Sequence, residues 1–226
     1  MPETNRIAMR PEVVHYLNGY FCGNGWTKFA ENPGANTEDT LYINMTTASS
    51  ETTDYKASYN VEADLMYTED SISAVYAIAA NRKIGSEALL EHIKIDKFSG
   101  DAWKESVAVA ISSFDGEKKM KMTGTLNVRG DAIHGTWTSG GTEGITWDAA
   151  SIAMKTQPTK TTYSTGDALD VTGAKITVTE YSGTSEDVNV TSAMCSGFDS
   201  ETAGTKTVTV TYRGQTTTFT VTVASA

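Results

Sequence analysis

Cysteine, proline and long apolar runs are scarce in this chain of 226 residues, which has 2 Cys and 4 Pro. Cys22 and Cys195 lie far apart, so the pattern argues against a disulfide framework and is compatible with a reducing compartment. No stretch reaches the length of a membrane-spanning helix, and the N-terminus lacks the apolar core of a secretion signal. We therefore expect no membrane insertion and no export by the general secretory route.

Basic residues are outnumbered: 18 Lys and Arg stand against 28 Asp and Glu, giving a formal net charge of −10 and a pI near 4.8. Most of the excess lies in residues 1–152, where 13 basic residues stand against 21 acidic ones. An acidic surface repels phosphates, so general nucleic-acid binding is not expected. Such a surface suits a protein past which DNA slides, although plain solubility is the commoner reason for an acid excess.

Recognisable catalytic motifs are missing: the sequence has no P-loop, no G-x-G-x-x-G, no G-x-S-x-G and no H-E-x-x-H. The three histidines, His15, His92 and His134, lack the spacing of metal ligands, and we interpret them as isolated strand or surface residues. Carboxylates are numerous, but chance pairs in an acidic protein carry no specific signal for acid–base catalysis. We expect no catalytic residue, no cofactor and no metal site.

Alternation of large apolar and small or polar side chains dominates residues 104–137. Successive side chains of a strand point to opposite faces, so this period of two predicts strands with one face toward a core. Asp-Gly at 115–116 and Arg-Gly-Asp at 129–131 are expected as turns between the strands. The stretch therefore predicts a three-stranded β-meander, which is a building block of a sandwich or barrel.

The stretch 70–80 is the one good helix candidate. Asp70 is a plausible N-cap, and Gly85 supplies a stop. Apolar residues at helical spacing, which define its buried face, are Ile72, Val75, Tyr76 and Ala79.

Glu62 and Asp64 share one face of a strand predicted within 55–67, whose other face carries Tyr59, Val61 and Ala63. One interpretation is a negatively charged lining of a channel. The alternative, a solvated sheet face, is the commoner arrangement in antiparallel sheets.

Turn-forming residues fill the stretch 32–54, apart from a short strand-like island at 41–43, and residues 1–20 are polar. A polar segment of this length is more often a functional arm or binding loop than an idle linker.

The composition changes after residue 139, and beyond residue 150 Thr, Val and Gly dominate. Strands recur there between turn signals, and the clearest pair is 206–212 with 216–223 around Arg-Gly-Gln at 213–215. We place a boundary at 150–153, which divides the chain into residues 1–150 and a small all-β domain at 153–226.

The last seventy or so residues resemble a bacterial Ig-like domain of group 3. The resemblance rests on YSTGDALD at 163–170, GAKITV at 173–178, SGFD at 196–199, GTKTVTVTY at 204–212 and FTVTV at 219–223. It implies a β-sandwich of a type added to other proteins to bind surfaces or carbohydrates.

The first 150 residues resemble a major tail tube protein of long-tailed bacteriophages. The resemblance lies in their layout: a polar arm, a long loop, YNVEAD at 59–64, the helix from Asp70, IKID at 93–96 and GDAIHGTW at 130–137. It implies a mainly β fold with a two-sheet β-sandwich or half-barrel and a flanking helix.

The tube-protein resemblance also implies a function. Subunits would assemble into stacked rings, hexameric in this family, around a channel that DNA crosses without specific binding. The chain would be a non-enzymatic virion protein, assembled in the host cytoplasm, with other tail proteins as partners. Its Ig-like domain would lie outside the tube, where a host-surface glycan is a possible contact.

Physical reasoning agrees with that picture, because strand edges of the meander would pair with neighbouring subunits. Ring stacking would then fall to the N-terminal arm and the 32–54 loop, which can become ordered on contact. Candidate lumen-facing residues are Glu62 and Asp64. The candidate stacking residues are Thr37, Glu38, Asp39, Asn44, Glu51 and Asp54.

Two other classes of protein stay open. A surface adhesin or carbohydrate-binding module of two β domains could use Trp103, Trp137 and Trp147 as platforms for sugars, although such residues are more often core or strand-edge anchors. A wall-degrading hydrolase is the third class, and it lacks any motif.

Overall fold

The computed structural model describes residues 13–40, 49–65, 69–116 and 120–225. Of these, residues 36–40 and 49–54 are described by their backbone alone. Strands predominate, so the predicted mainly β fold is confirmed. The chain divides into two compact units, Met1–Ile145 and Thr146–Ala226. No helix among the described residues is long and apolar enough to cross a membrane.

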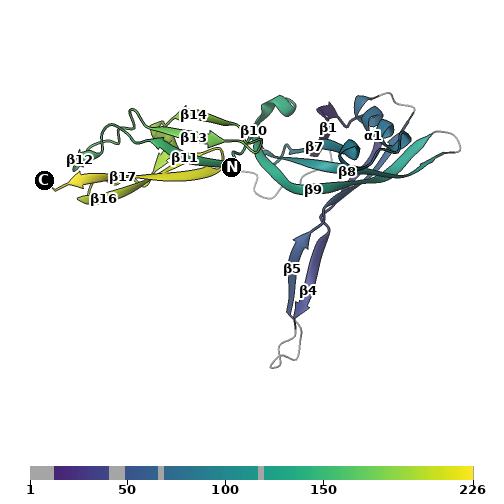
Figure 1. Cartoon of the computed structure of the whole chain (residues 1–226), viewed down its shortest axis with the longest axis horizontal. Coiled ribbons are helices and arrows are strands. Elements are labelled where there is room, and N and C mark those ends of the chain that lie inside the picture. The colour runs from purple at the N-terminus through teal and green to yellow at the C-terminus, as the bar shows by residue number, and fades with distance from the viewer. Residues whose placement is uncertain (1–12, 41–48, 66–68, 117–119, 226) are drawn as a thin grey trace. The chain divides into compact units, whose positions relative to one another are not determined.

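An antiparallel sheet of eight strands forms the first unit (Figure 1). Its order is β2-β1-β7-β8-β9-β6-β3, and β10 pairs with β9. The strands are β1 (Val13–Leu17), β2 (Tyr20–Phe21), β3 (Trp26–Asn32), β6 (Ser58–Asp64), β7 (Leu89–Asp96), β8 (Asp101–Asp115), β9 (Lys121–Trp137) and β10 (Ile145–Trp147).

The predicted meander is a hairpin of two long strands, β8 and β9. Its predicted turn at Asp-Gly 115–116 is right, since β8 ends at Asp115, opposite Lys121. The predicted turn at 129–131 is wrong, because β9 runs through it. Ser106 pairs with Arg129 and Lys104 with Ile133, so the residues between form a bulge opposite Glu105. A glycine at positive φ, Gly130 at 75°, serves a bulge as well as a turn.

Helix α1 (Asp70–Ala80) lies where the sequence predicts it. The cap assignments are wrong, because Glu69 occupies the N-cap position and Arg82, at φ 52°, ends the helix before Gly85. Gly85 instead begins the short 3-10 helix η2 (Gly85–Ala88).

The core of the first unit lies between α1 and one face of the sheet. Ile72, Val75 and Ile78 project from the helix, whereas Tyr76, expected on the buried face, is exposed. The 3-10 helix η2 adds Ala88, and strands β1, β3, β6, β7, β8 and β9 supply the other side chains of this cluster: Leu17, Trp26, Tyr59, Val61, Ala63, Leu90, Val107, Met122 and Leu126.

A separate two-stranded hairpin, β4 (Ala35–Thr40) with β5 (Ser49–Tyr55), occupies most of the predicted loop. The Lys56 N–H donates to the Gly34 carbonyl over 2.8 Å, which closes the base of the hairpin. Figure 1 shows β4 and β5 continuing from β3 and β6. The turn-forming composition was misleading here, because Thr also favours strands. The predicted island at 41–43 lies outside the described residues.

Two sheets form the second unit, in the orders β11-β13-β14 and β12-β17-β16-β15. Side chains from both sheets meet in one apolar core, which includes Tyr163, Ile176 and Phe219. The strands are β11 (Ser151–Thr156), β12 (Thr162–Ser164), β13 (Lys175–Thr179), β14 (Ser185–Asn189), β15 (Cys195–Ser196), β16 (Gly204–Tyr212) and β17 (Gln215–Ala224), and the 3-10 helices are η3 (Thr142–Gly144), in the first unit, and η4 (Ser192–Met194).

Truncating Ile72 to alanine should lower the free energy of unfolding by about 2–5 kcal/mol, because the change leaves a cavity between helix and sheet. Chemical denaturation followed by tryptophan fluorescence measures it. Ser73→Ala, at the exposed neighbouring position, is the matched control and should change stability by less than about 0.5 kcal/mol. Equal effects of the two changes would contradict the assigned helix face.

Candidate functional site

Glu62 and Asp64, the predicted lumen-facing residues, lie on β6 in different surroundings. Glu62 is partly exposed, its side chain at 33%, and its carboxylate lies 3.5 Å from Lys28 Nζ on β3. Asp64 is only 5% exposed, and its N–H donates to the Gly25 carbonyl over 2.7 Å. A channel lining needs an accessible carboxylate, which within this subunit Glu62 has and Asp64 lacks.

The predicted stacking residues lie on the β4–β5 hairpin, except Asn44, which is outside the described residues. Thr37, Glu38 and Asp39 belong to β4, and Glu51 and Asp54 to β5. The strand register sets Glu38 opposite Glu51. Like charges at directly opposed positions destabilise an isolated strand pair. The hairpin therefore carries two acidic residues at directly opposed positions of its register.

The sheet curls until its two ends approach each other. Within the described part of the chain, β3 pairs with β6 alone, and β2 pairs with β1 alone. The ring of His15 on β1 stacks on that of Phe29 on β3, with centroids 4.1 Å apart and planes 17° apart. We call this contact of side chains between β1 and β3 the seam. It leaves a half-barrel whose last strands meet without a backbone ladder.

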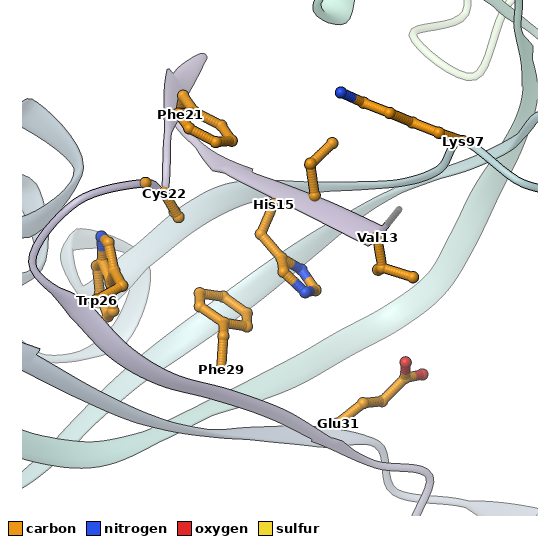
Figure 2. Close-up of a pocket in the computed structure, with 10 residues that line it drawn as sticks. Val13, His15, Phe21, Cys22, Trp26, Phe29, Glu31 and Lys97 are labelled. Carbon is orange, nitrogen blue, oxygen red and sulfur yellow. The ribbon is translucent and has the colours of Figure 1, made fainter. Parts of the chain in front are cut away.

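A cleft of roughly 660 Å³ opens at the seam (Figure 2). Figure 2 shows the rings of His15 and Phe29 facing each other, with Glu31 and Lys97 toward the rim. A volume of this size is typical of ligand pockets, and the lining is mostly apolar. Its residues are Val13, Val14, His15, Phe21, Cys22, Gly23, Trp26, Phe29, Glu31 and Lys97.

A buried chain of hydrogen bonds lies behind His15. Nδ1 of His15 is 3.1 Å from Nε2 of His92, and Nδ1 of His92 is 2.9 Å from Oε1 of Glu105. The hydroxyl of Tyr59 donates to the same oxygen over 2.5 Å. His92 is 0% and Glu105 9% exposed. We call these four side chains the His–Glu chain.

The electrostatics of this chain favour an ionised carboxylate. Burial alone would raise the pKa of Glu105, but the hydrogen bonds from His92 and Tyr59 outweigh it, and the pKa lies below its ordinary value. Burial, followed by the bond to Glu105, raises the pKa of Tyr59, so its hydroxyl keeps the proton. The Glu105 carboxylate is thus a buried negative charge that accepts hydrogen bonds from the Tyr59 hydroxyl and from Nδ1 of His92.

No local pattern in the sequence predicts this cluster, since His15 and His92 are 77 residues apart. The one available signal is alternation: His15 is two positions before Leu17 and His92 two positions after Leu90, and both leucines face the core. The interpretation as isolated histidines is therefore wrong for this pair. His134 lies elsewhere on β9, with Nε2 3.1 Å from Oδ1 of Asp101.

The second unit contains a loop organised by Asp199, within the SGFD segment. Its carboxylate accepts hydrogen bonds from the Thr202 hydroxyl, the Lys206 ammonium and the N–H of Glu201. These hydrogen bonds, of which the one from Thr202 has the largest effect, lower the pKa of Asp199 below its ordinary value. The loop before β16 is thereby fixed by local polar contacts.

Residues 156–223 match the family model of the bacterial Ig-like domain (group 3). The C-terminal unit is an Ig-like domain. Its two facing sheets and apolar core fit that assignment.

One curated relative is an exo-beta-1,6-galactobiohydrolase of Bifidobacterium longum subsp. longum, 43% identical over 86 residues. The match covers 35% of this chain and 6% of the enzyme, so the chain corresponds to a small part of that relative. A chain in the cryo-EM structure of the anti-feeding prophage baseplate, 6-fold symmetrised, superposes with a TM-score of 0.33 at 8% identity. That superposition covers 54% of this chain and 89% of the other, and at this level it identifies neither fold nor function.

The two cysteines should differ in reactivity. Burial raises the pKa of Cys22, at the cleft, to about 12, so at pH 8 only about one molecule in ten thousand carries the reactive thiolate there. Burial also raises the pKa of Cys195, which is less deeply placed. Iodoacetamide should therefore alkylate Cys195 first, as followed by peptide mass spectrometry. Both thiols should react alike in denaturant, and faster labelling of Cys22 in the folded chain would contradict its assigned surroundings.

Proposed function

We propose that this chain is a structural virion protein, the major tail tube subunit of a long-tailed bacteriophage. Its front unit would polymerise into stacked rings, hexameric on the family resemblance, around the channel that DNA crosses. The Ig-like domain would be displayed outside the tube. The observation that carries the proposal is the half-barrel, whose terminal strands β2 and β3 each have one open edge among the described residues and which is extended by the β4–β5 hairpin.

Open strand edges support self-association. A terminal strand presents unpaired N–H and C=O groups, which soluble proteins normally cover, shorten or charge. Strand β3 has seven residues and pairs with β6 along its length apart from a register shift between Trp26 and Lys28, so among the described residues its other side is an open edge of the same length. Pairing of this edge with a neighbouring copy would satisfy these groups and close a ring.

The hairpin supports contact between rings. Its two strands form their own sheet and join none of the other strands described. An isolated two-stranded hairpin is marginal in water, so it gains most from docking on a partner. Its acidic positions, Glu38 and Glu51 among them, would dock on a basic surface of the next ring.

Charge supports the passage of DNA. Glu62 would line the channel, and the acid excess of the front half would keep phosphates from adhering. As a tube subunit the chain would catalyse no reaction and need no cofactor. It would assemble in the host cytoplasm, with other tail proteins as partners. Contact of the Ig-like domain with a host-surface glycan belongs to the same proposal.

Charge reversal on the hairpin should prevent assembly. In the double variant Glu38→Lys and Glu51→Lys, the docking charges change sign while the half-barrel is untouched. Negative-stain microscopy and light scattering at high concentration should show rings or tubes for the wild type, and at least about a tenfold loss of assembled mass for the variant.

A matched control reverses two exposed acids of the Ig-like domain, Glu186→Lys and Glu201→Lys, which changes the net charge equally. This control should assemble like the wild type. A wild-type chain that stays monomeric at high concentration would overturn the tube proposal itself. An equal loss of assembled mass in both variants would instead show that the hairpin charges have no specific role in assembly.

A second candidate, a carbohydrate-binding surface protein, is favoured by the 43% identity over 86 residues to a segment of an exo-beta-1,6-galactobiohydrolase. Trp103, Trp137 and Trp147, the predicted platforms for sugars, support this candidate less, because all three are partly buried. The ring of Trp103 also has Lys94 Nζ over it, 4.5 Å from the ring centroid.

Calorimetric titration with β-1,6-linked galactobiose separates the candidates. A carbohydrate-binding protein should bind it with a Kd between about 1 μM and 1 mM and show no tubes. Formation of tubes without measurable binding of galactobiose would exclude the carbohydrate-binding candidate and support the tail tube subunit.

A further inference from the structure

The β4–β5 hairpin carries negative charge and no positive charge of its own. Residues 35–55 contain four acidic residues and no Lys, Arg or His; the acidic residues are Glu38, Asp39, Glu51 and Asp54. The register places Glu38 directly opposite Glu51, and like charges at such positions destabilise a strand pair. The hairpin is therefore stabilised most by docking on a surface that is basic.

One corner of the first unit presents unpaired positive charge. Arg82 and Lys83 follow α1 directly, and both are exposed. Neither side chain forms an ion pair or a hydrogen bond with another described residue, and this includes Glu87, the acidic residue nearest to them in sequence. The next residue, Ile84, is 82% exposed. We call residues 82–84 the basic corner.

Arg82 occupies a backbone position that glycine usually fills. Its φ is 52°, its N–H donates to the Ala79 carbonyl over 3.1 Å, and the Lys83 N–H donates to the Ile78 carbonyl over 3.0 Å. This pair of bonds is the helix ending in which glycine is the commonest left-handed residue. A residue with a Cβ costs free energy in that conformation, so arginine is a poor choice for ending the helix. Strain of this kind points to a function for the side chain.

The hairpin and the basic corner lie at opposite ends of the sheet. Strands β3 and β7 run in the same direction, because the three strands between them are each antiparallel to their neighbours. The hairpin follows the end of β3, whereas the basic corner precedes the start of β7. Trp26 Nε1, at the start of β3, donates to Ser71 Oγ of α1 over 3.0 Å, which places the helix at that same end. A contact between hairpin and basic corner is therefore a contact between two copies.

We propose that the basic corner is the surface on which the acidic hairpin of a second copy docks. This docking rests on the tube function proposed above, in which the hairpin joins successive rings. The contact joins unlike ends of two subunits, so it is heterologous, and its repetition builds an open stack instead of a closed dimer. The exposed Ile84 beside the two cations shields the new ion pairs from water, which strengthens them.

Reversal of the corner charges tests this docking. The double variant Arg82→Glu and Lys83→Glu sets like charges against each other, so light scattering and negative-stain microscopy should show at least about a tenfold loss of assembled mass. Adding the hairpin changes Glu38→Lys and Glu51→Lys to the same chain makes the two surfaces complementary again. This fourfold variant should recover assembly to within about threefold of the wild type, whereas two unrelated losses would add.

Mixing the two double variants tests the head-to-tail geometry. Each alone carries a hairpin and a corner of the same sign and should not assemble. In an equimolar mixture each hairpin meets a corner of opposite sign on the other protein, so tubes should form. Failure of both the mixture and the fourfold variant would overturn the basic corner as the docking surface.

A single substitution separates docking from folding. Arg82→Gly relieves the backbone strain and removes one cation, so the midpoint of thermal unfolding should not fall while assembled mass drops at least about threefold. Arg82→Lys, the matched control, keeps the charge and should assemble like the wild type. Undiminished assembly of Arg82→Gly would overturn a docking role for this residue, and this pair of variants decides if the charge-reversed chains fail to fold.

The other adjacent pair of lysines or arginines in the chain is Lys118 with Lys119, which lies outside the described residues. Reversing this pair to glutamate changes the net charge equally and should leave assembly at the wild-type level. A loss as large as that of the corner variant would overturn the assignment to the corner, although wild-type tubes would still support the tube function. A wild type that forms no rings or tubes would overturn the tube function, and the docking with it.

Discussion

The first unit depends on the stacking of His15 on Phe29, where the two ends of its sheet meet. A sheet that closes through a backbone ladder satisfies its own edges, whereas closure through side chains leaves them available. The ring at this contact is polar and half-buried, and its Nδ1 has a hydrogen-bond partner inside the sheet. That partner is His92, which in turn needs Glu105 and Tyr59. One contact between strands thus involves three buried side chains besides the half-buried His15.

Local signals in the sequence were sufficient for several elements. The period of two in β8 and β9, and the spacing of Ile72 and Val75 in α1, depend on neighbours a few residues away, and the structure agrees with both. The bulge at 129–131 was not predictable, because Arg-Gly-Asp suits a turn as well as a bulge and the pairing of Lys104 with Ile133 decides between them. The hairpin at 35–55 was hidden by its turn-forming composition.

The His–Glu chain was beyond sequence reasoning for a different reason. Its members come from four strands, and their convergence needs the sheet order and the register of each pair. His92 faces Glu105 directly across β7 and β8, whereas Glu91, one residue away, pairs with Ser106. A shift of one residue in register would have separated the pair. Only long-range pairing carries this information.

The two units differ in what they bury. Among the described residues the buried polar or charged side chains are Asp64, Ser71, His92 and Glu105, all in the first unit, and the core of the Ig-like domain is apolar apart from the Tyr163 hydroxyl. Burying a carboxylate costs free energy unless every bond to it is kept. The core of the first unit therefore depends on keeping the bonds to the Glu105 carboxylate, whereas the core of the Ig-like domain depends on apolar packing.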